Sequence, residues 1–166
     1  RVSDFLIGKN KTVNRELMQL MRNAGWLSCS LGIETFSDKM LRVPSLNKVG
    51  FNSMDCKAVS DAMIEIGIVP QVNIILGIPE YTPEELMKTI QTAVEYIMKG
   101  CDLSLSRQLL CLPGAPIYSD GRYKTEQVKW SHPVTGEVVE IPDYFVPEDP
   151  AIAQAMENFD EVAQIE

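Results

Sequence analysis

The sequence predicts an α/β domain with parallel strands, followed by a β-hairpin and a C-terminal helix. One pattern occurs three times: an amphipathic helix, a glycine, a short apolar strand and a glycine-containing loop. This alternation implies right-handed crossovers between parallel strands. The pattern stops after Tyr118. We therefore expect residues 1–118 to hold the alternating elements and residues 119–166 to form a C-terminal extension.

The three repeats share one internal order. In each predicted helix the i, i+3, i+4, i+7 spacing gives one apolar face, and a glycine suited to the left-handed conformation follows. The predicted strands span residues 27–33, 69–78 and 102–110. They are rich in Ile, Val and Leu with little alternation, as expected when both faces of a parallel sheet are covered. Val2–Gly8 is predicted as a further strand, which gives three to four parallel strands.

Two helix starts can be placed by their residue types. Thr82 can cap a helix, Pro83 suits its first position, and Glu85 completes a capping box. Ser37 followed by Asp38 predicts a shorter helix after the first strand. Spacing alone is compatible with either a (β/α) barrel or a doubly wound sheet.

The extension has a different pattern. Residues 127–130 and 138–141 flank a turn with Pro and Gly, which predicts a β-hairpin. Asp149–Glu166 is predicted to be an acidic helix. Its apolar face consists of Ile152, Ala155, Met156 and Phe159.

Charge and hydropathy argue against two classes of partner. The net charge is −8 and the basic residues are scattered, which argues against nucleic-acid binding. The longest apolar runs are too short to cross a bilayer, and no signal pattern is present at the N-terminus. We expect a cytoplasmic protein with no nucleic-acid partner and no membrane span.

The four cysteines are dispersed. The two nearest are ten residues apart, so no CxxC or CxxxCxxC spacing is present. We expect reduced, buried thiols and no metal ligands in this chain. The cysteines are Cys29, Cys56, Cys101 and Cys111.

Two polar residues stand out near the ends of predicted strands. Glu34 directly follows an apolar strand, where ligands collect in parallel α/β folds, although it could equally be a solvated loop acid or a helix cap. Asn73 lies inside an apolar strand and either satisfies itself on nearby backbone or faces a ligand. His132, the only histidine, lies in a predicted exposed turn and is expected to be structural. We expect no catalytic residue in this chain.

Four segments together resemble the radical S-adenosylmethionine (radical SAM) superfamily over about residues 1–118. They are LGIETFS at 31–37, the pair Asn47 and Lys48, NIILGIPEYTPEEL at 73–86 and LPGAP at 112–116. Their order, together with the HPVTG segment at 132–136, is most similar to the cobalamin-binding branch, which includes anaerobic magnesium-protoporphyrin ester cyclases.

The resemblance implies the fourth to sixth strands of a partial (β/α) barrel. The parent enzyme would reductively cleave S-adenosylmethionine at a 4Fe-4S cluster and act on a small-molecule substrate. The ligands of the cluster, and any cobalamin domain, would lie outside this chain. The chain alone would therefore be inactive.

The resemblance also implies roles for individual residues. Glu34 matches a polar residue that contacts the ribose or methionine part of S-adenosylmethionine. Lys48 matches a basic residue that pairs with the methionine carboxylate, and Asn73 matches a polar residue near the ribose hydroxyls. Ile75 and the backbone around Leu110 would line the adenine pocket.

Two other classes of protein compete with this interpretation. A free-standing α/β ligand-binding or regulatory module is the main alternative, and it predicts a sheet with protected edges. An aldolase-type barrel fragment is disfavoured because no Schiff-base lysine or metal-ligand cluster is evident. If the barrel is partial, the edge at Val2–Gly8 is exposed, and we expect a homodimer through this edge or cover from the C-terminal segment.

Overall fold

The computed structural model describes residues 1–163, without the side chains of residue 120 and residues 159–163. The chain forms two compact units: residues 1–74 with 84–105, and residues 75–83 with the chain from residue 106 onward. The chain passes between the units within two strands, β4 (Val69–Gly77) and β5 (Asp102–Gln108). Each unit is described separately. The boundary expected between residues 118 and 119 stays a prediction.

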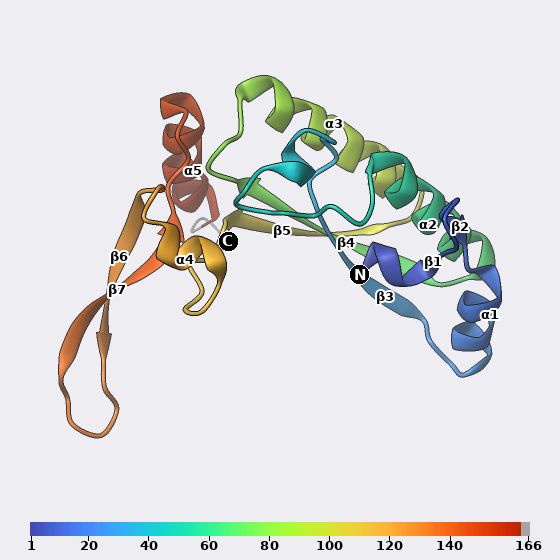
Figure 1. Ribbon diagram of the computed structural model, residues 1–166, viewed down its shortest axis with the longest axis horizontal. Coiled ribbons are helices and arrows are strands. Elements are labelled where there is room, and N and C mark those ends of the chain that lie inside the picture. The colour runs from blue at the N-terminus through green and yellow to red at the C-terminus, as the bar shows by residue number, and fades with distance from the viewer. Residues whose placement is uncertain (164–166) are drawn as a thin grey trace. The chain divides into compact units, whose positions relative to one another are not determined.

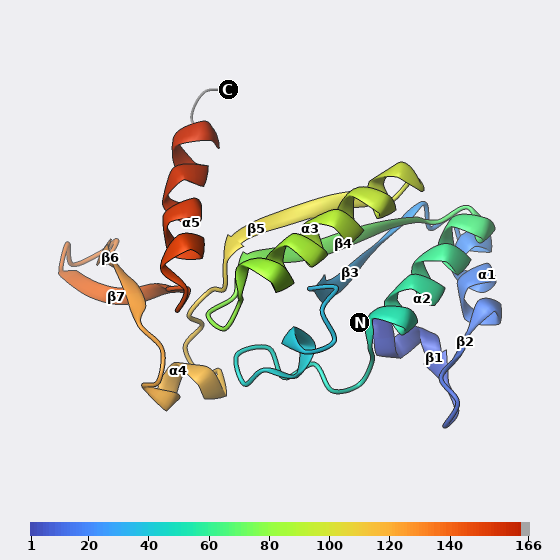
Figure 2. The ribbon, with the colours of Figure 1, turned by 90° about the horizontal axis from the view of Figure 1, so that it is seen from above.

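The main sheet has three parallel strands in the order β3-β4-β5, where β3 is Ser28–Glu34 (Figure 1). In the first unit the helices α2 (Ser53–Ile66) and α3 (Pro83–Met98) lie on the same face of this sheet (Figure 2). A shorter helix, α1 (Arg15–Asn23), precedes β3. The predicted α/β fold, consistent with a partial barrel, is confirmed.

The expectation that both sheet faces are covered was wrong for β4. Every second residue is buried, because the helices cover one face only. The buried positions are Pro70, Val72, Ile74 and Leu76, whereas Val69 and Gln71 are exposed and Asn73 and Ile75 are half-buried. The less covered face is therefore the one that can present polar side chains to a ligand.

The prediction of a parallel strand at Val2–Gly8 was also wrong. Val2–Phe5 forms a 3-10 helix, η1, and a two-residue strand, β1 (Leu6–Ile7), pairs antiparallel with β2 (Thr12–Val13). Val2 and Phe5 are both buried, and three residues per turn put them on the same side of a 3-10 helix. The described sheet therefore has three parallel strands.

The predicted helix signals are largely correct. The Asn52 side chain accepts a hydrogen bond from the Asp55 backbone N–H and caps α2, which ends at Gly67 with a φ of 84°. Ser37 Oγ accepts from the backbone N–H of Met40, the first residue of a short 3-10 helix, η2 (Met40–Arg42). The predicted helix after Thr82 begins at Pro83.

The second unit contains α4 (Pro116–Asp120), the hairpin β6 (Thr125–Ser131) and β7 (Val138–Phe145), and α5 (Pro150–Ala163). The predicted hairpin and terminal helix are confirmed; residues 164–166 and the Phe159 side chain lie outside what the structure describes.

The base of the hairpin is anchored to the segment that follows β5. Leu109 O accepts from the Phe145 backbone N–H at 3.0 Å, and the Cys111 N–H donates to Asp143 O at 2.7 Å. Cys111, Tyr123 and Phe145 form a small buried cluster there. The predicted strand 102–110 thus ends at residue 108, because the following residues pair with β7 instead.

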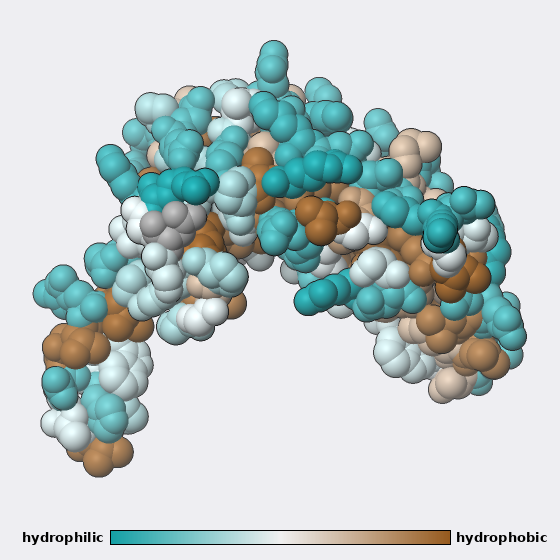
Figure 3. All heavy atoms as spheres, viewed as in Figure 1, coloured by the Kyte–Doolittle hydropathy of each residue, from teal (hydrophilic) through white to brown (hydrophobic). Residues whose placement is uncertain are grey.

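The outer part of the hairpin exposes apolar side chains (Figure 3). Val128 pairs with Ile141 and Trp130 pairs with Val139 across the two strands, so these four side chains share one face. None of the helices in residues 1–163 is both long and apolar enough to span a bilayer.

Candidate functional site

Glu34 and Lys48 form an ion pair in the first unit. Lys48 Nζ donates to Glu34 Oε1 at 3.1 Å and lies 3.5 Å from Gly32 O. The Glu34 side chain is 18% exposed and that of Lys48 is 26% exposed. The structure therefore brings together two of the residues that the sequence singled out. The pair is partly shielded yet accessible.

The backbone of Glu34 is in the left-handed region, with a φ of 69°. The strand register shifts at the same place: Gly32 pairs with Asn73 and Glu34 pairs with Ile74, so Ile33 is bulged out of the pairing. A left-handed conformation costs a non-glycine residue about 1–2 kcal/mol and persists only where its surroundings hold it. Such strain is typical of functional positions.

Buried hydroxyl groups hold the loop that follows Glu34. Thr35 Oγ1 and Thr89 Oγ1 share a hydrogen bond of 2.9 Å, and both residues are fully buried. The Ser37 backbone N–H donates to Thr35 Oγ1 at 3.1 Å. The ring of Phe36 packs against that of Tyr96 with 4.6 Å between centroids. This loop is thus tied to α3, and the backbone of Glu34 is fixed by it.

Gly32 leaves the space that the ion pair occupies. A Cβ atom at this position would lie 2.8 Å from Glu34 Oε1 and 3.7 Å from Lys48 Nζ. A side chain here would displace the Glu34 carboxylate. A glycine is therefore required at position 32 because the Glu34 carboxylate lies close to its Cα, and not because the backbone needs a positive φ.

The loop that carries Lys48 is fixed by backbone hydrogen bonds. The Lys48 N–H donates to Leu41 O at 2.7 Å, and the Asn47 N–H donates to Val43 O at 2.9 Å. Asn47 has a φ of 48°, which an Asn tolerates better than most residues. Lys48 therefore reaches β3 from a defined backbone position.

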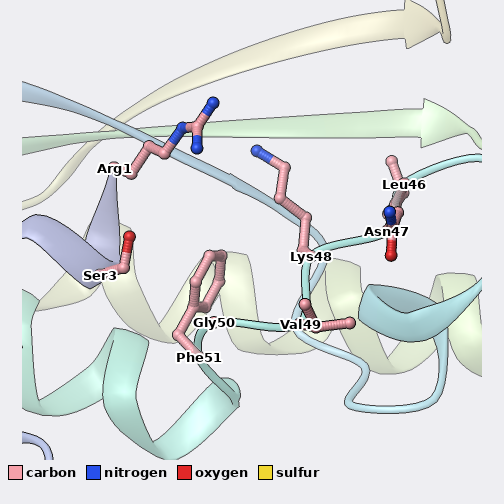
Figure 4. A pocket seen from close by; sticks show the side chains of 8 residues that line it. All are labelled: Arg1, Ser3, Leu46, Asn47, Lys48, Val49, Gly50 and Phe51. Carbon is pink, nitrogen blue, oxygen red and sulfur yellow. The ribbon is translucent and has the colours of Figure 1, made fainter. Parts of the chain in front are cut away.

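A cavity of about 360 Å³ is lined by Lys48 of this pair, whereas Glu34 is not among its lining residues (Figure 4). Arg1 and Lys48 extend toward one another along it, and Ser3, Asn47 and Phe51 contribute further lining. Arg1 is largely exposed, with 82% of its side-chain surface accessible. The cavity is large enough for part of a small organic ligand.

Asn73 lies on the less covered face of β4. Its Nδ2 donates to Ser30 Oγ on β3 at 3.0 Å. The sequence left open whether this amide bonds to nearby backbone or faces a ligand. The amide nitrogen instead donates to a neighbouring side chain, and the contact with a ligand stays a prediction. Ser30 was missed, although the polar residues at alternate positions 28 and 30 of β3 could have indicated a polar face.

The two residues expected to line the adenine pocket lie in the second unit. Ile75 is half-buried, and the Leu110 side chain is 48% exposed. Leu109 and Cys111 use their backbone groups to pair with β7. Because successive backbone groups of an extended chain face opposite edges, those of Leu110 face away from β7.

A further polar pair in the second unit escaped the sequence analysis. Tyr123 OH donates to Glu80 Oε1 at 2.5 Å. Burial raises the pKa of the Tyr123 phenol to about 12, and the Glu80 carboxylate adds to this shift. Tyr123 thus stays a neutral donor, which links the loop after β4 to the segment before β6.

The cysteines do not suit an iron–sulfur cluster. All four are free, and burial raises the pKa of the Cys56 thiol to about 12. Thiolates are the metal ligands, so a raised pKa opposes ligation. Within residues 1–163, no group of three or more His, Cys, Asp or Glu residues could hold a metal ion.

Comparison with known proteins identifies two similar solved structures, both radical SAM enzymes. The radical S-adenosylmethionine methyltransferase TsrM from Kitasatospora setae, with tryptophan and the analogue aza-SAM bound, is 15% identical, with a TM-score of 0.63 over 87% of this chain and 34% of its own. Coproporphyrinogen III oxidase (HemN) from Escherichia coli is 23% identical, with a TM-score of 0.48 over 57% of this chain and 21% of its own.

The chain thus spans about a third of the length of the methyltransferase and about a fifth of the length of the oxidase. No protein-family model and no curated protein sequence matches it. The likeness to the methyltransferase shows a shared fold.

Proposed function

We propose that this chain is the C-terminal part of a radical SAM barrel and that its first unit binds the methionine part of S-adenosylmethionine. The proposal is supported by the fold shared with the methyltransferase and by the Glu34–Lys48 pair at the carboxyl end of β3. The cluster that supplies reductive cleavage would be held by residues outside this chain. The isolated chain is then a binding element without activity.

The ion pair is the observation that carries this proposal. The methionine part of S-adenosylmethionine has an ammonium and a carboxylate on one carbon. Glu34 can accept hydrogen bonds from the ammonium and Lys48 can donate to the carboxylate, so one ion pair is exchanged for two charge-assisted contacts. Separation of a mostly buried ion pair is costly when it leaves a charge uncompensated, but here each charge would gain an opposite charge from the ligand.

Two further polar side chains of the first unit fit the ribose of the ligand. Ser30 and Asn73 offer hydroxyl and amide groups on the less covered face of the sheet, and both types of group hydrogen-bond to ribose hydroxyls. In the second unit, Ile75 and the backbone of Leu110 are the proposed walls for adenine. Glu34 and Lys48, the residues proposed to bind the methionine part, are in direct contact with each other.

Several finer points belong to the same proposal. We place the parent in the cobalamin-binding branch, with a small-molecule substrate and a cytoplasmic location. Val2–Gly8, the edge expected from the sequence, is not part of the three-stranded sheet, and β3 is an outer strand of that sheet instead. We therefore propose that a second copy of the chain protects the β3 edge.

The proposal is tested by titrating the chain with S-adenosylhomocysteine, which keeps the amino-acid part and is chemically stable. Glu34→Gln should weaken binding by about ten- to a hundredfold, since one charge-assisted hydrogen bond is worth roughly 1.5–3 kcal/mol. Lys48→Met should have a similar effect. Isothermal titration calorimetry gives the affinities, and thermal melts show that the variants fold.

Glu65→Gln is the matched control, because Glu65 forms an exposed ion pair with Arg15 on the outer surface of two helices. This control should bind like the unmodified chain. If Glu34→Gln also binds unchanged, the pair is only structural and the proposed role of Glu34 and Lys48 fails.

A further inference from the structure

A small cavity lies between the helices α2 and α3 of the first unit, which cover one face of the sheet (Figure 2). Its volume is about 140 Å³. Pockets for drug-sized ligands begin at roughly 300 Å³, so this cavity fits a group of only a few heavy atoms. Neither Glu34 nor Lys48 lines it. The cavity is therefore distinct from the site proposed above.

Three lysines from the two helices line this cavity. Lys57 belongs to α2, and Lys88 and Lys99 belong to α3. Lys99 Nζ donates to Asp61 Oδ1 at 3.0 Å, which joins the two helices. Lys57 and Lys88 are exposed, and neither forms an ion pair or hydrogen bond with another described residue. Two uncompensated ammonium groups from different helices therefore border one cavity.

Each helix also places a hydroxyl group beside its lysine. Ser53 and Lys57 are four residues apart on α2, and Lys88 and Thr92 are four apart on α3, so each pair shares one helix face. Ammonium groups and hydroxyls all donate hydrogen bonds. A phosphoryl group has three acceptor oxygens and a charge of about −1.5 to −2. It therefore suits these four donor groups better than a carboxylate, which has two oxygens and a single charge.

The charge of the cavity lining favours an anion, although one acidic residue opposes it. Glu95 is the one carboxylate among the described lining residues. Because Asp61 neutralises Lys99, the two free lysines and Glu95 leave one net positive charge at the cavity. The chain as a whole carries a net charge of −8. The lining thus runs against the overall charge of the protein.

We propose that this cavity binds a phosphoryl group between Lys57 and Lys88, carried by free phosphate or by a phosphate monoester. The inference goes beyond the proposed function and does not depend on it. An anion between the two ammonium groups offsets their mutual repulsion and forms charge-assisted hydrogen bonds with both. The hydroxyls of Ser53 and Thr92 donate to the remaining phosphoryl oxygens.

The test is a titration of the unmodified chain, followed by backbone amide NMR at constant ionic strength. Inorganic phosphate and glycerol phosphate are the two probes. At least one should give saturable shifts centred on Ser53, Lys57, Lys88 and Thr92. Tighter binding of glycerol phosphate identifies a monoester as the ligand, and equal or weaker binding identifies free phosphate. The absence of saturable shifts at these residues with either probe would overturn the inference.

Variants localise the effect. The double variant Lys57→Gln/Lys88→Gln should bind about tenfold more weakly or worse, because it loses two charge-assisted hydrogen bonds. Lys9→Gln/Lys129→Gln is the matched control, since it removes the same charge from exposed positions outside the cavity. Glu95→Gln should bind more tightly, because the opposing carboxylate is gone. Equal weakening in the double variant and its control contradicts the inference, since only the overall charge would then matter.

The outcomes separate this inference from the proposed function. If S-adenosylhomocysteine binds and responds to Glu34→Gln but neither phosphate probe binds, only the phosphoryl site fails. If a phosphate probe binds as described but S-adenosylhomocysteine does not, the phosphoryl site stands and the proposed function fails.

Discussion

Replacement of Gly77 by alanine should destabilise the protein through a backbone contact. The added Cβ would lie 2.7 Å from Gln108 Cγ, 2.8 Å from Arg107 O and 3.2 Å from Gln108 Cα. Favourable carbon–carbon contacts begin near 3.5 Å, so β5 must move by several tenths of an ångström. Overpacking of this kind costs about 1–3 kcal/mol.

For a chain of this size, such a loss lowers the melting temperature by roughly 2–12 °C. Thermal unfolding followed by circular dichroism measures the shift. Gly50→Ala is the matched control, because its Cβ would meet only Ser3 Cβ at an ordinary 3.6 Å. The control should melt within about 3 °C of the unmodified protein. Equal melting temperatures for the two variants would refute the packing of β4 against β5 described above.

Three further predictions concern the ion pair, the buried phenol and the cysteines. Gly32→Ala should fold normally but bind S-adenosylhomocysteine more weakly, because its Cβ would meet the flexible end of the Glu34 side chain at 2.8 Å. Differential scanning calorimetry measures the stability, and isothermal titration calorimetry measures the affinity. The folded state keeps Tyr123 protonated to about pH 12, whereas an unfolded tyrosine ionises near pH ~10. The stability that this group adds is present below pH ~10 and lost by about pH 12. The melting temperature of Tyr123→Phe should therefore fall less between pH ~10 and ~12 than that of the unmodified protein. Anaerobic reconstitution with iron and sulfide should give no stoichiometric cluster, and about four iron atoms per chain by metal analysis would contradict this.

The sequence predicted the elements whose signals are local. The i, i+3, i+4 periodicity and the glycine ends placed the helices, and Pro83 marked the start of α3 correctly. The hairpin followed from two strand segments and a turn. These patterns succeed because each depends on neighbours a few residues apart.

Features that depend on distant residues were not predicted. The Thr35–Thr89 hydrogen bond joins residues 54 positions apart, and the Tyr123–Glu80 bond joins residues 43 apart. Val2–Gly8 looked like a strand because its apolar residues suit either a strand or a short 3-10 turn. Its short length left periodicity unable to decide.

The candidate site was predicted in part. Glu34 was found because it follows an apolar strand, and its pairing with Lys48 emerged only from the fold. The left-handed backbone of Glu34 could not be foreseen, since it is imposed by the bulge at Ile33 and the buried hydroxyls beyond. The cavity between α2 and α3 was overlooked because its lysines come from two helices whose contact depends on the fold.

The central claim is that the Glu34–Lys48 pair binds the amino-acid part of S-adenosylmethionine. Backbone amide NMR shifts recorded during titration with S-adenosylhomocysteine test it most directly. The account predicts saturable shifts centred on Gly32, Glu34 and Lys48, abolished by Glu34→Gln. Saturable shifts that leave these amides unmoved, or that persist unchanged in Glu34→Gln, would contradict it.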